Sequence, residues 1–175
     1  MNSTRLLACA LGLALLPLGC GKREVKDASY THTGPAFSLA YPEAWKPEKP
    51  RYPNEVFRAT DPGTLPTIAV SLYPGTPAAY VDEHYADKFV AGMKSLFPKA
   101  SDYKVVSSGM TRLQDGTPAS EVTCEWTWED GATRLASCNV SAVKDGSLVS
   151  VTCTAVPGLP PDVLGKYPHT LAFGK

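Results

Sequence analysis

Cysteines carry the most reactive side chains in this 175-residue chain, and thiols can form disulfides, bind metals or take covalent lipid. Of the five, Cys124, Cys138 and Cys153 lie in the second half of the sequence. No C-x-x-C pair occurs, and no histidine stands at metal-ligand spacing from these thiols. The pattern favours structural thiols over a redox pair or a thiolate metal site, and we expect no metal and no cofactor.

Cys20 ends a segment that is typical of export. Arg5 precedes an apolar run over residues 6–18, which is shorter than the roughly 20 apolar residues that span a bilayer. The segment resembles the lipobox of bacterial lipoproteins, although Pro17 stands where leucine is usual. The resemblance implies cleavage before Cys20 and attachment of membrane lipid to its thiol. The alternative is an ordinary secretory signal, but no A-x-A cleavage site follows the apolar run.

Two expected hairpins predict how the other cysteines face one another. A two-residue turn at Asp145-Gly146 places Cys138 opposite Cys153, and a three-residue turn at 130–132 places Cys124 opposite Cys138. The second of these pairs is then the non-hydrogen-bonded one, in which the β-carbons lie closer. For an exported protein we predict a disulfide between Cys124 and Cys138, with Cys153 a buried thiol outside it. A register slip of one residue would undo this pairing.

Candidate catalytic groups are few. His84 has Asp82, Glu83 and Asp87 near it in the sequence, but neighbouring residues on a helix point about 100° apart, so this cluster favours a solvated polar face over a metal site. The sequence has no G-x-S-x-G, no H-E-x-x-H, no phosphate-binding loop and no dinucleotide fingerprint. We therefore expect no enzyme and no catalytic residues.

Composition excludes some classes of partner. Lysine plus arginine number 17 and aspartate plus glutamate also 17, so no basic surface indicates nucleic acid. The chain divides into a signal peptide at 1–19, a polar lipid-anchored tether at 20–34 and one domain at 35–175, because the remaining length suits a single hydrophobic core.

The hydrophobic pattern of the domain predicts an antiparallel sheet. One strong helix is expected from Ala78 to Phe97, with Thr76 as its N-cap and Pro77 at its first position. Its apolar face is Val81, Tyr85, Phe89, Met93 and Leu96, while Glu83, Asp87 and Lys94 point to water. A short helical turn is expected at 163–167. Strands are predicted at 37–41, 56–60, 67–73, 103–112, 117–128, 133–143, 148–156 and 170–173.

The order of these motifs resembles the PsbP-like and DcrB-like exported domains. The likeness rests on F-S-L-A-Y-P-E-A-W (37–45), the helix after the third strand, T-R-L-Q-D-G-T-P-A-S-E-V (111–122), K-D-G (144–146) and T-L-A-F (170–173). It implies an α+β fold, a PsbP-like α/β/α sandwich with a central antiparallel sheet, one long helix and a short C-terminal helix. It implies little about activity, because the fold serves as a photosystem II accessory subunit in one branch and as a partner of a nuclear-transport GTPase in another.

We expect a membrane-anchored lipoprotein that works as a non-catalytic envelope accessory or protein-interaction domain with an unknown envelope partner. Gly21 after the lipidated cysteine favours the periplasmic face of the outer membrane or the cell surface. The alternative is a periplasmic small-ligand-binding domain, with a pocket between helix and sheet or near Trp45. A hydrolase would need a nucleophile close to His84 or His169. The alternating Trp126 and Trp128 favour core packing over an exposed binding patch.

Overall fold

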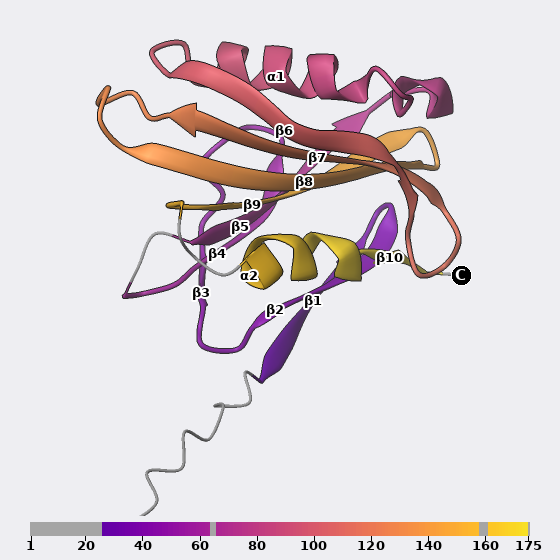
Figure 1. Cartoon of the computed structure of the whole chain (residues 1–175). Helices are drawn as coiled ribbons and strands as arrows, with labels where there is room; N and C mark the ends of the chain where they lie inside the picture. The colour runs from indigo at the N-terminus through magenta and orange to yellow at the C-terminus, as the bar shows by residue number, and fades with distance from the viewer. Residues whose placement is uncertain (1–25, 64–65, 158–160, 175) are drawn as a thin grey trace, which may run out of the picture.

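The computed structural model describes residues 26–63, 66–157 and 161–174. In these residues two antiparallel sheets form, a large one with strand order β3-β4-β5-β9-β8-β7-β6 and a small one with order β1-β2-β10. Helix α1 lies on one face of the large sheet, and the small sheet lies with helix α2 on the other (Figure 1). The result is an α+β sandwich dominated by strands.

The elements have the following bounds. The large sheet contains β3 (Lys46–Glu48), β4 (Glu55–Thr60), β5 (Thr67–Pro74), β6 (Ser101–Arg112), β7 (Pro118–Thr127), β8 (Arg134–Lys144) and β9 (Ser147–Ala155). The small sheet contains β1 (Asp27–Thr33), β2 (Ala36–Pro42) and β10 (Ala172–Phe173). The helices are α1 (Tyr85–Leu96) and α2 (Pro161–Lys166), with 3-10 turns η1 (Ala78–Tyr80) and η2 (Pro168–Thr170). Each strand predicted from the sequence has a counterpart here.

The larger core lies between the two sheets. Central strands β5, β8 and β9 contribute valine and isoleucine side chains to this core, and β2 and the C-terminal segment cover them. Its fully buried members include Ile68, Val70, Val149, Val151 and Leu171. This apolar face fixes which way every other residue of these strands points, because side chains alternate between the two faces of a sheet.

The second core lies under α1. Tyr85, Phe89 and Met93 of the helix pack with Val122 and Trp126 of β7, as the predicted apolar face requires. Helix α1 contacts β6 and β7 and does not extend over the other edge of the sheet (Figure 1). The part of this face formed by β4, β5 and β9 is therefore left without a covering helix.

The predicted helix from Ala78 to Phe97 is too long. Val81 has extended backbone angles that interrupt it, and the Oδ1 atom of Asp82 accepts a hydrogen bond from the His84 backbone N–H. This side-chain turn starts the helix at Tyr85, so Thr76 and Pro77 belong to the preceding turn instead. Within the described residues, neither α1 nor α2 has the length and apolar character needed to cross a membrane.

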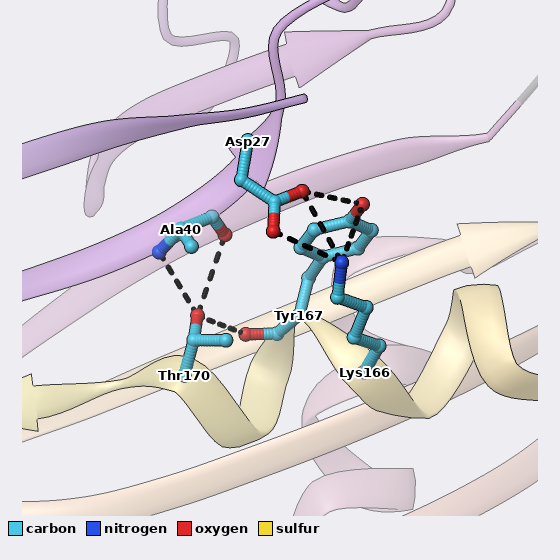
Figure 2. A network of polar contacts seen from close by, with 5 residues as sticks. All are labelled: Asp27, Ala40, Lys166, Tyr167 and Thr170. Carbon is cyan, nitrogen blue, oxygen red and sulfur yellow. Dashed lines mark hydrogen bonds and ion pairs between the residues drawn. The ribbon is translucent and has the colours of Figure 1, made fainter. Parts of the chain in front are cut away.

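Residues 27–33, expected in the tether, form strand β1 instead and pair with β2 over its full length. Asp27, at the start of β1, attaches this strand to two residues of the C-terminal segment (Figure 2): Lys166 Nζ lies 3.0 Å from Asp27 Oδ2, and the Tyr167 hydroxyl donates to Asp27 Oδ1 at 3.0 Å. The Thr170 hydroxyl bonds the backbone of Ala40 in β2. The chain therefore enters the domain at Asp27, on the side of the large sheet opposite α1.

The predicted disulfide is wrong, because the β7–β8 loop is one residue longer than expected. The Trp128 N–H bonds the Thr133 carbonyl, and Asp130 accepts hydrogen bonds from the N–H groups of Ala132 and Thr133, which stabilises a four-residue loop. Cys124 then pairs with Ser137, so it lies on the opposite face of the sheet from Cys138.

The second hairpin agrees with the prediction. Asp145 and Gly146 both have positive φ, Lys144 pairs with Ser147, and Cys138 pairs with Cys153. All three cysteines are buried thiols outside any disulfide. Burial raises the pKa of Cys124 to about 11 and those of Cys138 and Cys153 to about 12, so the thiols are protonated at neutral pH.

We expect iodoacetamide at pH 8 to leave Cys124, Cys138 and Cys153 unlabelled in the folded protein and to label all three after unfolding without reductant. The reason is that the sulfur atoms are both buried and protonated. Peptide mass spectrometry measures the labelling. A peptide pair that links Cys124 to Cys138 before reduction would contradict this register.

Candidate functional site

The uncovered part of the large sheet forms the floor of a cleft with a volume of about 1030 Å³. One wall is helix α1, and the other is the loop before β4, which carries Arg51 and Tyr52. The end of the β7–β8 hairpin, with Trp126 and Trp128, bounds the cleft as well. This volume is at the upper end of the range of small-molecule sites in proteins.

Hydroxyl groups form the floor of the cleft. Strand β5 contributes Thr67 and Ser71, and β9 contributes Ser150, Thr152 and Thr154. These residues share one face because Thr67 pairs with Thr154 and Ser71 with Ser150 in the antiparallel register. We call this set the hydroxyl floor.

Polar side chains of β8, in the part of the sheet that α1 covers, form hydrogen bonds to the hydroxyl floor. Asn139 has no exposed surface, and its Nδ2 donates to Ser150 Oγ at 2.8 Å and to Thr152 Oγ1 at 2.9 Å. The Tyr85 hydroxyl of α1 donates to Ser141 Oγ at 2.7 Å, and Ser141 lies 3.0 Å from Ser150. Burial raises the pKa of Tyr85 to about 12, so the phenol keeps its proton and donates. These bonds hold the floor hydroxyls in place.

A buried ion pair lies at the β4 side of the cleft. Arg58 Nε is 2.7 Å from Glu55 Oε1, and only 11% of the Arg58 side chain and 1% of the Glu55 side chain are exposed. Glu55 Oε2 accepts hydrogen bonds from the backbone N–H groups of Arg51 at 2.9 Å and Tyr52 at 3.3 Å. The guanidinium charge offsets the carboxylate charge at Oε1, and two backbone hydrogen bonds compensate Oε2, which makes the buried pair tolerable.

Aromatic contacts connect the two walls. The Tyr52 ring meets the Phe97 ring edge-on at 5.8 Å between centroids, and Phe97 stacks on Trp126 at 5.3 Å. The Arg58 guanidinium carbon lies 5.9 Å from the Tyr52 ring centroid. The ion pair and the end of α1 are therefore joined through one side chain, which limits their relative movement at this end of the cleft.

The candidate residues of the sequence analysis lie elsewhere. Cys20 is outside the described residues. His84 and His169 each lie near a glutamate, Glu83 at 3.6 Å and Glu121 at 3.2 Å, and in the described residues neither hydrogen bonds to a serine, threonine or cysteine. No group of three or more His, Cys, Asp or Glu in those residues could hold a metal.

The tryptophans divide between the core and the cleft. Trp126 is buried in the core under α1, as predicted, and its Nε1 donates to Ser137 Oγ at 3.0 Å. Trp128 is half-buried beside Phe97. Trp45 is 5% exposed and packs against Tyr167, so the predicted alternative of a pocket near Trp45 does not apply.

Sequence reasoning missed the hydroxyl floor, Asn139 and the ion pair. A signal for the first was present, because β9 reads S-L-V-S-V-T-C-T-A, with hydroxyl residues at every second position against Val149, Val151 and Cys153. Such alternation on a central strand indicates a polar face that is not part of the core. Nothing in the sequence indicated that Glu55 and Arg58 would pair in a buried site.

No family model matches the sequence, and no curated protein matches it either. Among solved structures, the chain is similar to the solution structure of cyanobacterial PsbP (CyanoP) from Synechocystis sp. PCC 6803, with TM-score 0.68 and 12% identity over 90% of this chain and 99% of that one. It is also similar to the crystal structure of the Ran-binding protein Mog1p of Saccharomyces cerevisiae, with TM-score 0.53 and 12% identity over 76% and 78%. At this identity the likeness shows the fold alone, and it confirms the predicted PsbP-like fold.

We expect Glu55→Gln to lower the free energy of unfolding by on the order of 3 kcal/mol, because it leaves the Arg58 guanidinium buried without an anionic partner. Urea denaturation measures the change. Glu48→Gln is the matched control, since Glu48 pairs with Arg51 at 2.7 Å where the side chains are 34% and 59% exposed. An exposed pair contributes about 0 to 1 kcal/mol. Equal losses in the two variants would contradict the structural role of the buried pair.

Proposed function

We propose that this chain with the PsbP-like fold is a non-catalytic binding domain held at a membrane by lipid, and that the cleft beside α1 is its binding site. The observation that carries the proposal is the cleft itself, a large concavity whose floor is polar and held in place from below. A sheet face left over from imperfect packing would carry scattered side chains, whereas this one carries aligned hydroxyl groups from two strands.

The chemistry of the cleft favours holding a ligand over transforming it. The floor hydroxyls bond to the amide of Asn139 and to one another, so no base is placed to activate them as nucleophiles. Each charged residue that lines the cleft already has a polar partner: Glu55 pairs with Arg58, Lys88 with Asp82 at 2.8 Å, Arg51 with Glu48 at 2.7 Å, and Asp130 accepts from the Thr133 hydroxyl at 2.6 Å. In the part of the chain that the structure describes, this leaves no pair suited to acid and base catalysis.

The proposed location rests on the sequence. The apolar run at 6–18, followed by Cys20, supports export and attachment to membrane lipid, with the domain at the periplasmic face of the outer membrane or at the cell surface. Because β1 begins at Asp27, the segment between the lipidated cysteine and the domain is short. The domain would work close to the membrane surface.

A second candidate function, docking of an envelope protein, is favoured by strand β6. It forms one edge of the large sheet, and it exposes Val105, Val106 and Met110 by 40%, 53% and 49%. An edge strand presents unpaired backbone groups to which a partner can add a strand. This surface lies away from the hydroxyl floor, so the two functions are separable.

We expect Cys20→Ala to abolish both membrane association and labelling by a radioactive lipid precursor, because it removes the thiol that takes the lipid. Cell fractionation and labelling of the expressed protein measure these effects. Cys9→Ala removes a thiol from the same segment and serves as the control that keeps the label. A Cys20→Ala protein that is still labelled would overturn the anchor.

We expect a small molecule to remain with the protein when it is purified from its native envelope and to be lost from Ser71→Trp, whose ring projects from the floor and obstructs the cleft. Native mass spectrometry detects the bound molecule. Ser107→Trp places the same side chain on the exposed β6 strand and should keep it. Equal amounts of bound molecule in the two variants, or no bound molecule in the wild type, would contradict binding in the cleft. A protein photocrosslinked at Val106 together with an empty cleft would support the edge-strand candidate instead.

A further inference from the structure

We infer that the ligand of the cleft is an anionic amphiphile, whose carboxylate or phosphate group binds the Arg58 guanidinium and whose apolar part lies against helix α1. This inference rests on the proposed function, because it names the class of ligand for the same cleft.

Both residues of the buried ion pair line the cleft, and Arg58 is the more exposed of the two. Its side chain is 11% exposed, whereas that of Glu55 is 1% exposed and its oxygens are taken by Arg58 Nε and two backbone N–H groups. In the described residues, the Nη groups of Arg58 make no hydrogen bond. A guanidinium presents two such groups as a planar fork that fits a carboxylate or phosphate. Arg51, Arg58 and Lys88 outnumber Glu55 and Asp130 among the charged residues that line the cleft, so the balance of charge favours an anion over a cation.

The space beside Arg58 is suited to a small oxyanion. In the cross-strand row that contains Arg58, its neighbour on β5 is Ala69, and the next residue along the row is Thr152 of β9. Ala69 has only a methyl group, so the row leaves space over β5 between the side chains of Arg58 and Thr152. Ser71 lies on the same face of β5, two residues further on.

The hydroxyl opposite Arg58 is prepared to donate. Thr152 Oγ1 accepts a hydrogen bond from Asn139 Nδ2 at 2.9 Å, which leaves its own O–H hydrogen for another acceptor. Asn139 is thus a positioning residue for this hydroxyl. An oxyanion over Ala69 would accept from Arg58 on one side and from Thr152 on the other.

The wall of α1 suits the rest of an amphiphile. Leu96 of α1 and Tyr80 of the turn before it line the cleft and are 43% and 37% exposed, and the buried Phe89 and Met93 line it as well. Such a surface is stabilised when an apolar chain removes it from water, by about 25 cal/mol for each Å² buried. The volume of about 1030 Å³ admits a molecule of lipid-like size and exceeds what a small hydrophilic acid would fill.

The test uses the full mature chain carrying Cys20→Ala, which avoids detergent, and isothermal titration with three probes, each kept below its micellar concentration or its solubility limit. Dodecanoate and dodecyl phosphate carry the anion, and dodecanol does not. We expect the two anions to bind at least tenfold more tightly than dodecanol, and Arg58→Gln to remove that difference. Lys94→Gln removes a positive charge from the exposed side of α1 and should change nothing. The two anions distinguish a fatty acid from a lipid phosphate.

A second variant covers the case in which Arg58→Gln fails to fold. Ala69→Val keeps the ion pair and fills the space for the oxyanion, so we expect the same loss of anion preference. If dodecanol and dodecanoate bind the wild type equally and Ser71→Trp abolishes the binding of both, the anionic class of ligand is overturned and the cleft remains a binding site. If no probe binds, the anionic-amphiphile inference is wrong, and native mass spectrometry of the envelope protein decides separately whether the cleft holds another ligand.

Discussion

Helix α1 can cover only about two strands of the large sheet, because a helix with its side chains is about 10 Å wide and neighbouring strands are about 4.8 Å apart. The sheet has seven strands, and α1 packs on the β6 and β7 side. A bare face of valine and isoleucine beyond the helix would be a large exposed apolar patch. Serine and threonine at these positions of β5 and β9 avoid that cost, and the concavity beside the helix follows from the same geometry.

The boundary between the covered and the open part of this face needs polar groups that tolerate complete burial. Asn139 and Ser141 lie there with no exposed surface, and each unmet hydrogen bond would cost about 1 to 3 kcal/mol. Tyr85 donates from the helix and Ser150 accepts from the open side, so the network links α1 to the floor of the cleft. Positioning of the floor and attachment of the helix therefore depend on the same hydrogen bonds.

Much of the fold could be predicted from local patterns. Alternation of apolar residues indicated the main strands, and the spacing of Tyr85, Phe89 and Met93 indicated the buried face of α1. The pairing of Cys138 with Cys153 also followed, because a two-residue turn leaves one register. The register of β7 against β8, which places Cys124 opposite Ser137, could not be predicted. It depends on the side chain of Asp130, which stabilises a loop of four residues where three were expected. A pocket between helix and sheet was one of the alternatives, but its lining could not be predicted, because it depends on which strands α1 covers and on the pairing of Glu55 with Arg58, both of which are tertiary.

The entry of the chain at Asp27 determines which way an anchored domain would face. Asp27 lies beside Lys166 and Tyr167, on the side of the large sheet opposite α1 (Figure 1, Figure 2). For a chain held at Cys20, the segment 20–26 reaches at most about 25 Å when extended. The bilayer would then lie behind the small sheet, and the mouth of the cleft would open toward the aqueous compartment. Such a domain receives its cargo from across the compartment, as an outward-facing acceptor, and is poorly placed to extract lipid from the leaflet that holds it.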